Sequence, residues 1–164
     1  MIVIRWKGPF TFDTAGEQEG HGIYLCWGRN RLGAPPAEPK LLYCGISAAA
    51  GGVGSRIKNH DDRDFNHAEN DWWVGNVSLP TRSTRRHLEA AEWMVVRFTG
   101  TEHNWQKTRS KPKFRAYLVN EWYSAKGAVR VNHVGVAGVV PDVLGWDPAE
   151  GHLRWAPSLR RTGE

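Results

Sequence analysis

Two short apolar runs, each containing a tyrosine and a glycine, constrain the fold of this chain more than any other feature. They cover residues 22–27 and 41–46 and are rich in aromatic, aliphatic and β-branched side chains. Runs of this kind between turn-forming residues are typical of β-strands. The connection between them, residues 28–40, contains three prolines, which disfavour regular structure and indicate a long loop. The runs therefore predict a β-hairpin that carries Tyr24 on one strand and Tyr43 on the other.

A glycine-rich bend after the second run leads into a predicted helix. Three glycines lie between residues 51 and 54, and residues 55–60 follow as the start of a helix with Ser55 as the candidate N-cap. On such a helix Arg56 and His60, which are four positions apart, lie on the same face. The sequence thus places a cation and an imidazole directly after the tyrosine hairpin.

A third strand and the clearest helix of the chain come next. Residues 71–80 predict a strand ended by a proline, and residues 84–99 predict a helix with Ser83 or Thr84 as its cap. The apolar face of that helix consists of Leu88, Ala91, Val95 and Phe98. Glu92 lies on the same face. Because burial of an ionised carboxylate is costly unless a cation or hydrogen-bond donors meet it, Glu92 is interpreted as an arginine partner, a rim residue or a metal ligand.

The remaining elements are predicted from weaker patterns. Short strands at residues 2–6 and 10–12 flank a Gly8-Pro9 turn, residues 116–124 form a short helix, and residues 128–134 form a further strand. From residue 141 onward the chain is rich in proline and glycine, and Trp146 and Trp155 are expected to pin it to the body. The expected fold class is α+β, in one domain with a core at residues 20–105 and a basic extension at residues 106–164.

Charge and composition restrict the partners and the cellular setting. The formal net charge of +5 favours a polyanionic partner, with nucleic acid first and an anionic membrane second, or no specific partner. No apolar run is long enough to span a bilayer, and Arg5 interrupts the N-terminus too early for a signal peptide. If both tyrosines face one side of the sheet, Cys26 shares that side and Cys44 does not, so no disulfide is expected. We therefore expect a cytoplasmic protein.

These features together resemble the GIY-YIG nuclease family over about residues 22–104. The matching positions, in chain order, are Gly22-Ile23-Tyr24, Tyr43-Cys44-Gly45, Arg56, His60, Glu92 and Asn104. The resemblance implies a three-stranded antiparallel sheet flanked by helices, with the tyrosines on the first hairpin. It also implies an arginine on the first helix and a metal-binding glutamate on a later one.

The activity implied by the resemblance is metal-dependent endonucleolytic cleavage of DNA, with RNA not excluded. Phosphodiester hydrolysis needs a base for water, a cation on the phosphate and stabilisation of the leaving oxygen. Tyr24 or Tyr43 would take or relay the proton, and Arg56 would hold the phosphate. Glu92 would hold one Mg²⁺ or Mn²⁺. His60 completes the set of catalytic candidates.

Three departures from the family pattern bear on mechanism. The two tyrosines are 19 positions apart and Tyr43 is 13 positions from Arg56, both longer than usual in the family. Cys44 stands where the family commonly has an aliphatic residue. The lysine that some members carry after the second signature is absent, because residues 46 and 47 are isoleucine and serine. Lys58 is the candidate substitute.

Candidate contacts to nucleic acid lie mainly in a basic run interleaved with aromatic residues. They are Lys58, Asn104, Lys107, Arg109, Lys111, Lys113 and Arg115. A solvated linker is the alternative interpretation of this run. Residues 28–40 and 107–115 are the candidate segments for substrate choice.

Two other functions remain open from the sequence. The first is a nucleic-acid-binding module on the same fold without catalysis. The second is a histidine–metal nuclease built on His60, Asp61, Asp62, Asp64 and His67, a cluster that is more often an ordinary polar loop.

Overall fold

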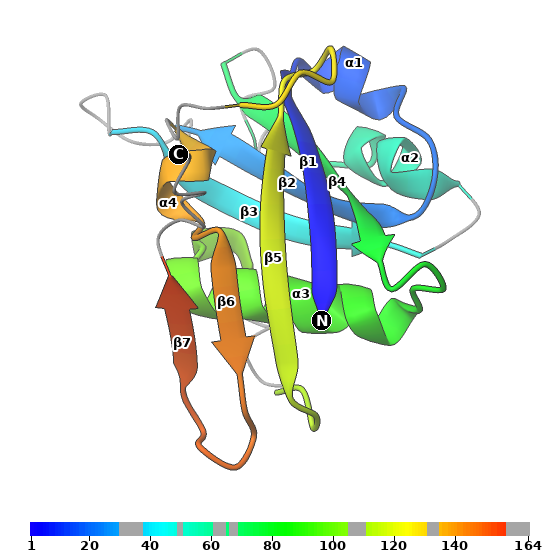
Figure 1. Cartoon of the computed structure of the whole chain (residues 1–164). Coiled ribbons are helices and arrows are strands. Elements are labelled where there is room, and N and C mark those ends of the chain that lie inside the picture. The colour runs from blue at the N-terminus through cyan, green and yellow to red at the C-terminus, as the bar shows by residue number, and fades with distance from the viewer. Residues whose placement is uncertain are drawn as a thin grey trace, which may run out of the picture.

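A seven-stranded mixed sheet, strongly curled into a half-barrel, dominates the fold. The computed structural model describes residues 1–29, 38–48, 51–60, 65, 69–104, 111–130 and 135–156. Within those ranges the strand order is β3-β2-β4-β1-β5-β6-β7, and four short α-helices accompany the sheet (Figure 1). The expected α+β class is confirmed, but the sheet is larger than its predicted three-stranded core.

The predicted tyrosine hairpin and third strand form one end of this sheet. Strand β2 (Gly22–Gly28) pairs antiparallel with β3 (Lys40–Ser47) along one side and with β4 (Asp71–Leu79) along the other. These three strands confirm the antiparallel arrangement expected from the sequence. Most of the predicted loop between β2 and β3, residues 30–37, lies outside the described residues.

The first strand is longer than predicted and lies in the middle of the sheet. Strand β1 (Ile2–Phe10) pairs antiparallel with β4 and parallel with β5. The predicted Gly8-Pro9 turn is wrong, because the strand accommodates these residues through a register shift between Lys7 and Phe10. The second predicted strand is wrong as well. Residues 12–16 form helix α1 (Phe12–Gly16), with Thr11 as its N-cap.

The predicted helix at residues 116–124 is strand β5 (Ala116–Tyr123). Its side chains alternate between buried and more exposed, and the buried set is Ala116, Leu118, Asn120 and Trp122. Asn120 sits at a core position because its amide is satisfied there. It accepts a 2.8 Å hydrogen bond from Trp6 Nε1 and donates a 2.7 Å bond to the Pro141 carbonyl. This polar residue interrupts the apolar alternation that would have predicted a strand.

The C-terminal part continues the sheet. After helix α4 (Val136–Val139), strands β6 (Val143–Trp146) and β7 (Leu153–Ala156) pair antiparallel, and β6 pairs with β5. Trp146 is buried, as expected, and its Nε1 donates to the Pro112 carbonyl at 2.8 Å. Trp155 is 57% exposed, although its ring lies 5.7 Å from that of Phe98. Of the strand predicted at 128–134, residues 131–134 lie outside the described residues, and Val129 makes a single bridge to Tyr123.

Helices cover both faces of the sheet. Helix α3 (Arg85–Thr99) contacts β2, β3, β5 and β6, so the curled sheet wraps around it, whereas α1 and α2 (Gly52–Lys58) pack on the other face. The predicted ends of α3 are confirmed. His87 Nδ1 accepts the backbone N–H of the N-cap Thr84 at 3.1 Å, and Gly100 ends the helix in the left-handed conformation.

Two further expectations concern the cysteines and membrane spans. Cys26 packs among the residues of the α1/α2 face and Cys44 among those of the α3 face, and the two do not form a disulfide. The predicted absence of a disulfide between them is therefore confirmed. In the part of the chain that the structure describes, no helix combines the length and apolar character of a transmembrane span.

Candidate active site

The two tyrosines and His60 form one cluster on the α1/α2 face of the sheet. The Tyr24 hydroxyl and His60 Nε2 are 2.8 Å apart and share a hydrogen bond. The Tyr24 and Tyr43 rings lie 5.8 Å apart between centroids, and the Tyr43 and His60 rings lie 4.9 Å apart. Tyr43 is directly opposite Cys26 in the hairpin, so the register places both tyrosines on the same face. The two tyrosines of the predicted hairpin therefore do lie together, in contact with His60.

Arg56 lies on helix α2, but His60, which the sequence placed on the same helix, does not. The helix begins at Gly52, after Gly51, and not at Ser55, and it ends at Lys58. His60 therefore lies beyond the helix, where its N–H donates to the Ile57 carbonyl at 3.0 Å. Arg56 is on the helix and exposed to solvent.

Close contact between α1 and α2 fixes the position of the second helix. The backbone N–H groups of Val53 and Gly54 donate to the carbonyls of Gly20 and Gln18, each at 2.9 Å. These bonds satisfy N–H groups of the first turn, which have no partner inside a helix. A Cβ at Gly54 would collide with the Gly16 carbonyl. The glycine-rich bend therefore allows the two helices to dock tightly.

Gly45, the glycine of the second signature, has a packing role between the tyrosines. A Cβ at this position would lie 2.6 Å from both Cζ and Oη of Tyr24 and 2.6 Å from Cε1 of Tyr43. Real carbon–carbon contacts are about 3.5–4.0 Å. Only glycine at this position lets the two phenols approach as they do.

The surroundings distinguish the two phenols chemically. Burial raises the pKa of Tyr24 far above its ordinary value, and the neighbouring Tyr43 adds to the rise. Burial also raises the pKa of Tyr43, and the charge of Glu92 adds to that rise, whereas a hydrogen bond from Tyr24 opposes it. The charge of Arg56 lowers the pKa of both phenols, so the hydrogen bond is what distinguishes them. Tyr24 is fully buried and Tyr43 half-buried. Tyr24 is therefore the phenol that keeps its proton. Tyr43 is the phenol whose ionised form is stabilised by a neighbouring hydrogen-bond donor.

Glu92 approaches the cluster from the other side of the hairpin. It is 3% exposed on α3, whose apolar residues pack with Ile23 and Leu25 on the face opposite the tyrosines. Its charge nevertheless contributes to raising the pKa of Tyr43, which lies on the edge strand β3. Glu89, the other carboxylate of α3, is exposed and pairs with Arg85 at 2.8 Å. The prediction that Glu92 is the inward-facing carboxylate of α3 is confirmed.

A metal ion at Glu92 would have few protein ligands. Among the described residues, no group of three or more His, Cys, Asp or Glu side chains is placed to hold a metal. A single carboxylate completed by water and phosphate oxygens is a donor set that suits Mg²⁺, which keeps several of its waters. The chemistry of one carboxylate is compatible with Mg²⁺, and the described residues do not form a closed protein cage. Glu92 is 3% exposed, however, and would have to become accessible to water and phosphate to hold the ion.

Asn104 ties the end of the α3 segment to strand β3. It is 2% exposed, and its Oδ1 accepts hydrogen bonds from Cys44 N at 2.8 Å and from Thr101 Oγ1 at 2.9 Å. Its Nδ2 donates to the Cys44 carbonyl at 2.6 Å. The amide thus pairs with both the N–H and the carbonyl of Cys44, next to Tyr43, as a neighbouring strand would at this edge of the sheet. This geometry gives Asn104 a structural role and does not support its prediction as a direct nucleic-acid contact.

The other predicted contacts are dispersed. Lys58, Lys111, Lys113 and Arg115 are exposed. The Lys58 chain packs over Gly16, and Arg115 forms an ion pair with Asp147. Several candidates lie outside the described residues, namely Lys107, Arg109, Asp61, Asp62, Asp64 and His67.

Sequence reasoning missed two aromatic residues of the cluster. The Phe65 and Trp72 rings lie 4.9 Å and 5.8 Å from the His60 ring, and both side chains are buried. Trp72 could have been predicted once the strands were aligned, because its pairing with Cys26 places it on the same face as Tyr24. Phe65 had no such signal, since this residue belongs to neither a helix nor a strand.

Comparisons with models of known families, with curated proteins and with solved structures found no match.

Proposed function

We propose that this protein is a metal-dependent endonuclease of the GIY-YIG type that hydrolyses phosphodiester bonds in DNA. The observation that carries the proposal is the cluster of Tyr24, Tyr43 and His60 with the Arg56 cation beside it. Each residue is ordinary by itself, but two phenols and an imidazole in contact, with a guanidinium close enough to lower the pKa of both phenols, form a set suited to phosphate chemistry. Their order along the chain also matches the resemblance seen in the sequence.

Tyr43 is the proposed base. The water oxygen bonds to phosphorus, its proton passes to the Tyr43 oxygen, and the bond from phosphorus to the leaving oxygen breaks. Tyr24 donates a hydrogen bond to Tyr43, which stabilises the ionised form of that phenol. His60 holds the Tyr24 hydroxyl in place. In this scheme Tyr24 and His60 are positioning residues for Tyr43.

Arg56 and Glu92 have complementary roles in the proposal. The exposed guanidinium of Arg56 offers two parallel N–H donors to the phosphate, and its charge also favours the Tyr43 phenolate. Glu92 would hold Mg²⁺ or Mn²⁺. Such an ion, when bound, stabilises the negative charge that develops on the leaving oxygen.

The test is a cleavage assay on supercoiled plasmid and on single-stranded oligonucleotides, with Mg²⁺, Mn²⁺ or EDTA. We expect cleavage only with a divalent metal, and a loss of at least about 100-fold in Tyr43→Phe and Glu92→Gln. Glu89→Gln is the matched control, because it neutralises an exposed carboxylate on the same helix and should cleave normally. Thermal unfolding should show that each variant is folded. Cleavage by Glu92→Gln at the normal rate would sink the metal assignment.

A further inference from the structure

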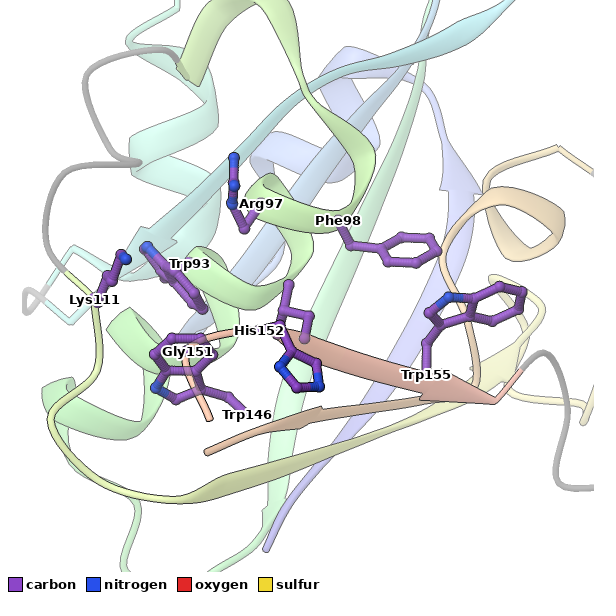
Figure 2. Close-up of a pocket in the computed structure, with 9 residues that line it drawn as sticks. Trp93, Arg97, Phe98, Lys111, Trp146, Gly151, His152 and Trp155 are labelled. Carbon is purple, nitrogen blue, oxygen red and sulfur yellow. The ribbon is translucent and has the colours of Figure 1, made fainter. Parts of the chain in front are cut away.

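A hollow lies away from the tyrosine cluster, between α3 and the β6–β7 hairpin. Its volume is about 460 Å³, within the range of roughly 300–1,000 Å³ typical of ligand sites. Four aromatic side chains line it, namely Trp93, Phe98, Trp146 and Trp155. Figure 2 shows Trp93 and Trp146 toward one end and Phe98 and Trp155 toward the other. The hollow therefore offers flat apolar surfaces to a planar group.

The polar residues of this hollow are basic. Arg97, Lys111 and His152 contribute to the lining, and none of the described residues that line it is acidic (Figure 2). Outside the lining, the Glu150 carboxylate lies 3.8 Å from His152 Nε2, and it also pairs with Arg154 at 2.7 Å. An aromatic site for a cationic ligand would not carry this charge, because like charges at its rim would repel the ligand. The chemistry fits a ligand that combines an aromatic ring with an anion.

We propose that this hollow binds a nucleotide of single-stranded nucleic acid. A base would stack against Trp155, whose ring is 57% exposed and supported by Phe98 at 5.7 Å. The flanking phosphates would be held by Arg97 and Lys111. Single-strand binding sites commonly combine aromatic stacking surfaces with a basic groove along the backbone. Bases inside a duplex are already stacked and paired, so only an unpaired or extruded nucleotide can enter.

The position of the hollow links it to the proposed catalytic carboxylate. Trp93 directly follows Glu92 on α3, and Arg97 lies little more than one helical turn further along. A nucleic-acid strand bound in the hollow would therefore contact the same helix that bears Glu92. This proposal rests on the proposed nuclease function, because that function is the reason to choose a nucleic acid over another aromatic anion. It adds that the substrate is single-stranded.

The test is fluorescence anisotropy with a labelled single strand of about twelve thymidines and a duplex of equal length, in EDTA at low salt. We expect tighter binding of the single strand. Trp155→Ala should weaken that binding about tenfold, whereas Trp155→Phe should keep most of it. Arg97→Gln and Lys111→Gln should each weaken binding and flatten its salt dependence. Tyr117→Ala, at a residue that is 50% exposed and outside the hollow, should have no effect.

Each result bears on the proposal. Loss of affinity in Trp155→Ala and retention in Trp155→Phe and Tyr117→Ala would support it. Equal affinity in wild type and Trp155→Ala would overturn it, as would a loss confined to the two charge variants. If Trp155→Ala does not fold, equal single-strand and duplex affinity of the wild type overturns it instead. A further outcome is that the wild-type protein binds the single strand through Trp155 and yet cleaves no substrate. That result would refute the proposed nuclease function but support the hollow as a nucleotide-binding site.

Discussion

Replacing Gly45 with alanine is the most direct test of the tyrosine cluster, because it adds one carbon and no chemistry. The new Cβ would start 2.6 Å from Tyr24 Cζ and Oη and from Tyr43 Cε1, about 1 Å inside normal contact. Tyr24 cannot yield easily, since it is fully buried and hydrogen-bonded to His60 at 2.8 Å. Tyr43 is half-buried on the edge strand and should move more. The proposed base would then leave its position.

Two magnitudes follow from this overlap. Overpacking of a buried site costs about 1–3 kcal/mol of the free energy of unfolding, and Tm falls by about 2–4 °C per kcal/mol in a chain of this size. A displacement of about 1 Å at a catalytic group lowers the cleavage rate about 100-fold. Urea or thermal denaturation measures the first effect and the plasmid assay measures the second.

Gly145→Ala is the matched control for this substitution. It is also a strand glycine, but its Cβ would meet Tyr117 at 3.4 Å, an ordinary contact. We expect unchanged stability or a gain of a few tenths of a kcal/mol, since alanine is stiffer than glycine in the unfolded chain. A Gly45→Ala protein as stable and as active as this control would refute the packing argument.

Two further predictions concern ionisation and the edge of the sheet. The cleavage rate should rise about tenfold per pH unit between about pH 7 and pH 9, because burial raises the pKa of Tyr43 and only its phenolate acts as the base. Tyr24→Phe removes a supporting hydrogen bond and should lower the rate at each pH, whereas a flat profile would contradict the role of Tyr43. Asn104→Ala should lower the free energy of unfolding by about 2–4 kcal/mol in urea titrations, because it deletes the hydrogen bonds to Cys44. Asn76→Ala, at an exposed strand position, should cost little, and equal losses in both variants would contradict this account.

The sequence predicted best where local pattern and long-range packing agree. Helix α3 has apolar residues at helical spacing and a clear signal at each end, so both its type and its ends were predicted. Strand β5 was mistaken for a helix because Asn120 occupies an inward position. Its amide is tolerated there only through Trp6 and Pro141, which are remote in the chain. No local pattern carries that information.

The candidate site divides in the same way. The hairpin register, with Tyr43 opposite Cys26, places Tyr24 and Tyr43 on one face. The sequence could only assume this, because alternation along each strand does not fix the register between strands. The approach of His60 depends on α2 ending at Lys58 and on a turn beyond it, so the four-residue spacing from Arg56 gave the correct residue for the wrong geometric reason. The burial of Asn104 against Cys44 depends on how the segment after α3 returns to the edge strand, which spacing alone does not reveal.

The central position of β1 has a consequence for how the chain folds. Its parallel pairing joins Ile2 to Leu118, residues more than 100 positions apart, and its antiparallel pairing joins Val3 to Leu79. Contacts of such long sequence separation form slowly, because the entropy of closing the intervening chain is lost first. The hairpin of β2 and β3 can assemble early, whereas the sheet is completed only once β5 has reached β1. Strands β5, β6 and β7 are therefore no appendage to a finished sheet, and a fragment that stops before β5 would leave the middle of the sheet as an open edge.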